Sequence, residues 1–237
     1  MNNKTSFYKE KAIALLTSKY QKPIITLLIF VIINAIITAI STATGPVIDY
    51  ADFTTSPARY PFIYFLIGIV SFVVGALITY ALQKMYIRIA RDENYEVEEI
   101  LKTTYGEEPV RSFVISLLMS IYIFLWSLLL IIPGIIKTYA YSMSMYIANK
   151  DLGLSASLCI TKSNELTSGH KFRIFLIDLS FLGWYLLSIL TFGILLLWIL
   201  PRHQTARTLL FEEIYEGQTI VEVKNSSNLD ELERLVH

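Results

Sequence analysis

Four long apolar runs constrain this chain more than any other feature. Each contains about 20 residues with almost no charge, the length that an α-helix needs to cross the hydrocarbon core of a bilayer. Apolar residues make up 54% of the 237 positions and charged residues 17%, against about 45–50% and about 25% in an ordinary soluble domain. This excess predicts an all-α membrane protein. The runs are Ile24–Ala43, Phe62–Leu82, Phe113–Ile132 and Phe172–Leu190.

Two less regular segments predict the return arms of hairpins. Gly134–Ala148 is short and follows a Pro133-Gly134 turn, and Phe192–Leu210 follows a turn at Thr191 and contains Pro201. With these two arms, the chain is expected to form about six transmembrane helices arranged as three hairpins.

The positive charges favour the same topology, because cytoplasmic loops hold most of the lysine and arginine near membrane spans. Thr44–Pro61 carries a single cation, Arg59, beside two aspartates, and is expected outside. The amino-terminal arm and the connection near residues 84–111 are cation-rich and are expected inside. Both termini are therefore predicted to be cytoplasmic. The cations are Lys4, Lys9, Lys11, Lys19 and Lys22, then Lys84, Arg88, Arg91, Lys102 and Arg111.

Three regions follow from this organisation. Residues 1–23 are predicted to form an amphipathic cytoplasmic segment, residues 24–212 the transmembrane domain, and residues 213–237 a flexible cytoplasmic tail. Two short amphipathic segments, Val97–Tyr105 and Ser155–Leu166, are expected to lie along the cytoplasmic interface of the membrane.

Asp178 is the strongest candidate for a functional side chain, because a carboxylate at membrane depth is costly. Folding the last hairpin about Thr191 brings position 178 opposite position 204, close to Arg202, His203 and Arg207. An ion pair of Asp178 with Arg202 or Arg207 is therefore predicted. Two roles stay open for it: fixing the register of the hairpin, or lining a route for a ligand or an ion.

Lys137 and Tyr141 are further candidates for ligand contact. Lys137 is expected to extend its ammonium group to the outer head groups. Tyr141 belongs to a tyrosine-rich segment with Tyr139 and Tyr146. These tyrosines are predicted either to anchor the helix at the bilayer interface, where tyrosine is common, or to form a polar lining.

Several classes of function find no support in the sequence. The charges balance at 20 Lys+Arg against 20 Asp+Glu, so no overall field attracts nucleic acid. One cysteine, Cys159, and three scattered histidines give no zinc-type ligand set. There is no Walker loop, no His-Glu-x-x-His and no Gly-x-Ser-x-Gly. We therefore expect no catalytic residue, no metal and no cofactor.

Four motifs stand out in the second half of the chain: Leu125–Lys137, Tyr141-Ser-Met, Ser168-Gly-His-Lys171, and Leu176–Trp184 with Pro201 downstream. They closely resemble those of a bacterial membrane-protein family, the domain of unknown function 975 family. The resemblance is strong from about Phe113 to Glu213, and it implies a polytopic cell-membrane protein without an established activity. Two positions depart from the family pattern, since Leu195 and Arg202 stand where such proteins often have Gly and Tyr.

The function expected from these observations is the handling or transport of lipid-like or amphiphilic molecules without catalysis. The alternative is a structural or interaction subunit of a membrane complex, such as one beside an exporter. The predicted partners are membrane lipids and a membrane protein, with no nucleic acid.

Overall fold

The computed structural model describes residues 5–17, 21–46, 48–49, 54–55, 60–106 and 109–236, with side chains as far as residue 219 in the last helix. The regular secondary structure of the described residues consists of helices and two paired two-residue strands, β1 (Ile48–Asp49) and β2 (Thr54–Thr55). The all-α prediction is therefore confirmed. The helices are α1 (Thr5–Thr17), α2 (Gln21–Thr44), α3 (Pro61–Ala90), α4 (Val97–Gly106), α5 (Pro109–Leu129), α6 (Ile131–Ala140), α7 (Ser144–Lys150), α8 (Ala156–Leu166), α9 (Lys171–Leu190) and α10 (Leu196–Val236).

Four of these helices, α2, α3, α5 and α9, are long and apolar enough to cross a membrane. They coincide with the four long apolar runs of the sequence. Large apolar side chains along them point away from the protein, including Phe65, Leu128 and Ile189, which are 64%, 73% and 72% exposed. Such a surface is compatible with contact to lipid and unfavourable in water.

The predicted turn at Pro133-Gly134 is wrong. The chain turns at Leu130, whose extended backbone (φ −164°, ψ 147°) separates α5 from α6. Pro133 and Gly134 lie in the first turn of α6, where a missing N–H costs nothing because the first backbone donors of a helix have no partner within it. Gly134 packs against Ser127 of α5, where a Cβ would come within 3.0 Å of the Ser127 Cα.

The predicted span Gly134–Ala148 is also not one helix. With 10 residues, α6 is about 15 Å long, half the thickness of a hydrocarbon core of about 30 Å. A turn over residues 141–143 follows α6, and α7 then continues the chain.

The last hairpin turns later than expected, because α10 begins at Leu196. Phe192 and Gly193 have positive φ values of 50° and 83° in the turn before it. The helix then continues through Pro201 to Val236. The segment predicted as a tail, residues 213–236, is thus helical, and its flexibility stays a prediction. His237 lies outside the described residues.

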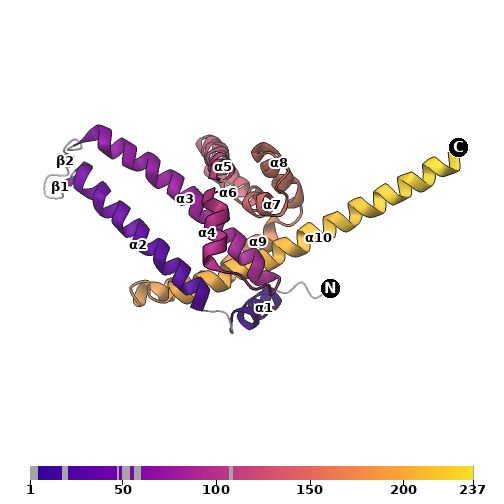
Figure 1. Ribbon diagram of the computed structural model, residues 1–237, viewed down its shortest axis with the longest axis horizontal. Helices are drawn as coiled ribbons and strands as arrows, with labels where there is room; N and C mark the ends of the chain where they lie inside the picture. Colours follow the sequence, from indigo (N-terminus) through magenta and orange to yellow (C-terminus); the bar gives the residue numbers. More distant parts are fainter. Residues whose placement is uncertain are drawn as a thin grey trace.

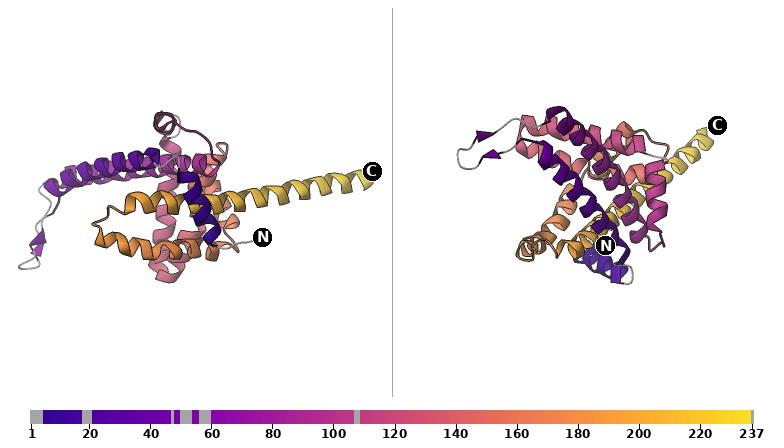
Figure 2. Two further views of the ribbon diagram at one scale, coloured as in Figure 1. Left: turned by 90° about the horizontal axis from the view of Figure 1, so that it is seen from below. Right: turned by 60° about the vertical axis from the view of Figure 1, so that its left-hand side comes forward.

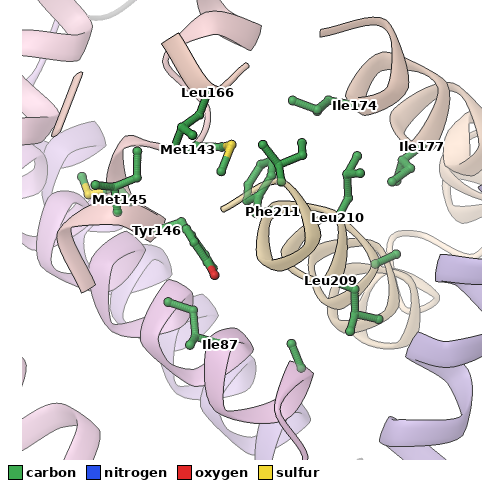
Figure 3. Packing of buried hydrophobic residues seen from close by; sticks show 14 of the residues in the cluster. Ile87, Met143, Met145, Tyr146, Leu166, Ile174, Ile177, Leu209, Leu210 and Phe211 are labelled. Carbon is green, nitrogen blue, oxygen red and sulfur yellow. The ribbon is translucent and has the colours of Figure 1, made fainter. Parts of the chain in front are cut away.

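The core of the protein forms where α10 passes between α9, α7 and α3. Figure 3 shows Phe211 of α10 on the side of Tyr146 of α7, and Leu210 of α10 on the side of Ile174 and Ile177 of α9. The α2–α3 pair extends from one side of this core and the second half of α10 from the opposite side (Figures 1 and 2). The first half of α10 therefore contributes to the core and packs against α9.

The two predicted amphipathic segments form α4 and α8. α4 packs against α3, and α8 packs against α5 and α7. Their place along a membrane interface stays a prediction.

Candidate functional site

Asp178 of α9 meets two cationic or ionisable side chains of α10. The Asp178 Oδ1 lies 2.8 Å from Nε2 of His203, and its Oδ2 lies 3.6 Å from Nη1 of Arg207. His203 and Arg207 are four residues apart and so share one face of α10. Of the two predicted arginine partners of Asp178, Arg207 is the one that forms this ion pair.

His203 extends the contact into a chain of polar groups. The Tyr185 hydroxyl lies 2.7 Å from His203 Nδ1, so both imidazole nitrogens have hydrogen-bond partners. In a neutral imidazole one nitrogen donates and the other accepts, which suits Asp178 as acceptor and Tyr185 as donor. Tyr139 of α6 lies near the same carboxylate. The residues Tyr185, His203, Asp178 and Arg207 are called the polar chain below, and they place a phenol, an imidazole, a carboxylate and a guanidinium in contact between α9 and α10.

Sequence analysis missed Tyr185 as a member of the polar chain. A signal was present, because Tyr185 follows Asp178 by seven residues and therefore lies on the same face of α9 two turns later. Phe181, between them on this face, packs on the His203 ring with the ring centroids 4.9 Å apart.

Arg202 contributes to a neighbouring cavity. Five residues separate it from Arg207, and at 100° per residue this turns the two side chains about 140° apart around α10. The cavity has a volume of about 170 Å³ and lies between α1, α9 and α10. Its lining consists of Lys9, Ile13, Phe181, Trp184, Leu195, Trp198, Ile199 and Arg202.

Lys9 holds α1 over this cavity. Its ammonium group donates to the carbonyl oxygen of Ser180 at 3.2 Å and lies 4.9 Å from the centroid of the Phe181 ring. Phe181 therefore contacts both Lys9 at the cavity and His203 of the polar chain. The contact of α1 with α9 was not predicted from the sequence.

A second polar cluster joins α1 to the beginning of α9 and the middle of α10. The Tyr8 hydroxyl donates to Glu213, and Arg173 Nη2 lies 2.6 Å from that hydroxyl and 2.9 Å from Glu213 Oε1. Burial and the hydrogen bond to Glu213 raise the pKa of Tyr8 to about 12. Burial alone would raise the pKa of Glu213, but the hydrogen bonds from Tyr8 and Arg173 outweigh it and lower that pKa.

Three cations near the start of long helices make equivalent contacts, and we call them the closing cations. Lys22 of α2 donates to the Tyr95 carbonyl oxygen at 2.6 Å and to Glu96 at 3.0 Å, beyond the end of α3. Arg111 of α5 donates to the carbonyl oxygens of Asp151 and Leu152, beyond the end of α7. Arg173 of α9 binds Glu213 of α10.

Lys137 and Tyr141 meet at a different place, around Trp126 of α5. The Lys137 ammonium group lies 4.7 Å from the Trp126 ring and 5.6 Å from the Tyr141 ring. Tyr141 is buried, and its ring centroid lies 6.0 Å from that of Tyr122. The positive charge of Lys137 is thus attracted to the faces of both rings. The contact of Lys137 with outer head groups stays a prediction.

No group of three or more His, Cys, Asp or Glu side chains among the described residues is placed to hold a metal ion. Cys159 is buried.

Comparison with known proteins gives one family. The sequence profile of a family described as "Protein of unknown function (DUF975)" matches residues 1–138 and 128–218. No curated protein and no solved structure matches the chain.

Proposed function

The chain belongs to the DUF975 family of proteins of unknown function, and we propose that it is a cell-membrane protein that binds lipid-like amphiphiles without catalysing a reaction. The proposed topology has six membrane passes in three helical pairs, with both termini in the cytoplasm. In two of the pairs the return arm is short, formed by α6 and by the first turns of α10.

The cavity between α1, α9 and α10 carries this proposal. It combines two tryptophans and several aliphatic side chains with the cations Lys9 and Arg202. An amphiphile has the same combination of an apolar chain and a polar end. Trp184 and Trp198 are 47% and 42% exposed, so the apolar side of the cavity continues into the apolar surface of α9 and α10.

The closing cations support the six-pass topology. Lys22 and Arg111 each join the start of one helical pair to the chain beyond it, and Arg173 joins the start of α9 to Glu213 in the middle of α10. When the two ends of a helical pair lie at the same side of the membrane, the chain crosses the membrane and returns within that pair. Three such pairs therefore make an even number of passes. Cations concentrated at these ends favour the cytoplasmic side.

Lipid retention by the purified protein tests the proposed binding. The full chain is extracted in a mild non-ionic detergent, and the lipid bound per protein is measured by mass spectrometry. Ile13→Trp introduces a large ring at the cavity, and we expect it to reduce the retained lipid at least about threefold. Ala14→Trp is the matched control, because Ala14 is an exposed neighbour on α1 outside the cavity lining. Equal lipid retention in both variants would refute the proposed site.

A second candidate function is an interaction subunit of a membrane complex. A groove of about 450 Å³ between α3 and α5 is lined in part by small residues, including Gly75, Ala76, Ser116 and Ser120, and in part by larger apolar side chains. Small residues let the backbones of two membrane helices approach closely. A photo-crosslinking amino acid at Ser120 that captures one stoichiometric membrane partner in cells would favour this function, and capture of lipid alone would count against it.

A further inference from the structure

We infer that the cavity between α1, α9 and α10 selects amphiphiles whose head group is an anion, such as a phosphate monoester. The inference rests on the proposed function, because it specifies the class of molecule that the same cavity binds. It goes beyond that function by assigning Lys9 and Arg202 the recognition of charge.

The charges around the cavity favour an anion. The described lining contains Lys9 and Arg202 and no carboxylate. The nearest acid of the polar chain, Asp178, is already bound by His203 and Arg207. Glu213 of α10, which accepts a hydrogen bond from Tyr8 beside Lys9, is bound by Arg173. Lys9 and Arg202 therefore place two cationic side chains in the described lining of the cavity.

The contacts of Lys9 leave its charge uncompensated. Its ammonium group donates to the carbonyl oxygen of Ser180 at 3.2 Å and lies over the Phe181 ring. A carbonyl oxygen and a ring face carry no full negative charge, and an ammonium group has three donors. Lys9 can therefore donate to an additional oxygen atom from an anionic ligand. Removing a cation from water is costly, and an anion that enters the cavity offsets this cost.

Lys9 and Arg202 complement each other as anion ligands. The planar guanidinium of an arginine binds two oxygens of a phosphate or carboxylate at once, whereas lysine acts as a point charge. The two side chains come from different helices, α1 and α10. A head group bound by both residues would thus link α1 to the last hairpin.

Because the cavity is small, we expect the head group of the amphiphile to lie inside it and the apolar chain to lie on the protein surface outside it. Sites that enclose a whole small molecule measure about 300–1,000 Å³, and this cavity measures about 170 Å³. It is large enough for a head group only. The chain of the amphiphile would then lie along the exposed faces of Trp184 and Trp198.

Tryptophan fluorescence provides the test, because two of the three tryptophans line the cavity. Trp126→Phe removes the third, so that the signal comes from Trp184 and Trp198. This full-length protein, in a non-ionic detergent at pH 7, is titrated separately with dodecyl phosphate, dodecylphosphocholine and inorganic phosphate. The first two share a tail and differ in net charge, and the third has the head-group chemistry without a tail.

We expect dodecyl phosphate to bind at least tenfold more tightly than dodecylphosphocholine, since one charge-assisted contact corresponds to roughly a tenfold change in affinity. Inorganic phosphate is expected to leave the fluorescence unchanged at the same concentrations. Lys9→Gln and Arg202→Gln should each weaken dodecyl phosphate binding roughly tenfold. Lys11→Gln is the matched control on α1, because Lys11 lies outside the cavity lining.

Lys9→Arg keeps the charge and should retain most of the affinity. This variant separates the loss of a cation from a loss of α1 packing, because both substitutions alter the contact with Ser180.

The outcomes are distinguishable. Equal affinity for the two detergents, with no effect of Lys9→Gln or Arg202→Gln, would overturn the charge selectivity while leaving amphiphile binding in place. Inorganic phosphate binding as tightly as dodecyl phosphate would assign the site to a free anion and overturn the inference. A flat signal with all three ligands would overturn both the inference and the proposed function.

Discussion

The imidazole Nε2 of His203 lies 2.8 Å from a carboxylate oxygen of Asp178, although the two residues are 25 positions apart and belong to opposite arms of the last hairpin. Their contact fixes the register of α9 against α10. A shift of α10 by one residue would turn His203 by about 100° around its axis and break the contact. The polar chain therefore specifies how these two helices pair.

Asp178→Asn should weaken this pairing. The amide oxygen can still accept a hydrogen bond from His203, but Arg207 loses its counter-charge in a largely buried position. We expect a loss of about 1–3 kcal/mol in the free energy of unfolding, measured as a lower midpoint of thermal unfolding in detergent. Glu98→Gln, at an exposed position of α4, is the control and should leave the midpoint unchanged.

Removing both charges tests whether Asp178 and Arg207 act as a pair. The double variant Asp178→Asn with Arg207→Gln should be more stable than the sum of the two single losses predicts, because neither charge is then left alone. Strict additivity of the two losses would contradict the pairing.

Gly134→Ala should destabilise the contact between α5 and α6. The new Cβ would lie 3.0 Å from the Ser127 Cα and closer still to its hydroxyl oxygen, so the two backbones must separate. Overpacking of this kind costs about 1–3 kcal/mol, and the thermal midpoint should fall accordingly. Gly183→Ala in α9 is the matched control, since a Cβ there meets no atom within 4 Å. Equal midpoints for the two variants would argue against the close approach.

The attachment of α1 should depend on pH at both extremes. Because the pKa of Glu213 is lowered in the folded protein from an ordinary value of 4.5, its contribution to stability is complete above about pH 4.5 and is lost as the pH falls through the folded pKa. The pKa of Tyr8 is raised from 10.0 to about 12, so its contribution is complete below pH 10 and is lost as the pH rises through about 12.

Thermal midpoints measured from about pH 3.5 to 12 should fall at both ends of this range, giving an acid limb and an alkaline limb of the pH profile. Glu213→Gln should flatten the acid limb and Tyr8→Phe the alkaline limb, whereas Glu216→Gln, at an exposed position of α10, should change neither. Unaltered limbs in the first two variants would show that other groups control the pH dependence.

Cysteine labelling in whole cells should report the proposed topology. In a Cys159→Ala background, Phe192→Cys places a thiol at the tip of the last hairpin, where Phe192 is 98% exposed. It should react with a membrane-impermeant maleimide added outside. Ser157→Cys on α8 should react only after the cells are permeabilised. The reverse pattern would invert the topology, and external reaction of both thiols would exclude the six-pass arrangement.

The long helices were predictable because a run of about 20 uncharged apolar residues has few alternatives to a helix. The turn at Leu130 was not, because every residue around it is apolar and no local signal separates a turn from a helix. Pro133-Gly134 suggested a turn, yet proline is equally well tolerated in the first turn of a helix. The sequence there supports both readings, and packing of Gly134 on Ser127 distinguishes them.

The candidate site was predictable only where it is local to one hairpin. The Asp178–Arg207 pair followed from folding the chain back on itself with a known rise per residue. The position of Lys9 could not follow from such geometry, because α1 lies far from α9 in the sequence and reaches it through tertiary packing alone. The choice between Arg202 and Arg207 stayed open for a related reason: hairpin register places a residue along the helix and leaves its direction around the axis undetermined.

The length of α10 has a mechanical consequence. This single helix contacts α1, α3, α8 and α9 along its first part and extends beyond them to Val236 (Figure 1). Pro201 removes one backbone hydrogen bond near the start of α10. Helices bend most easily at such a proline. From Pro201 to Val236 the helix spans about 53 Å, so a rotation of about 10° at that point would displace its far end by about 9 Å. α10 therefore has the geometry of a lever whose pivot lies beside the cavity.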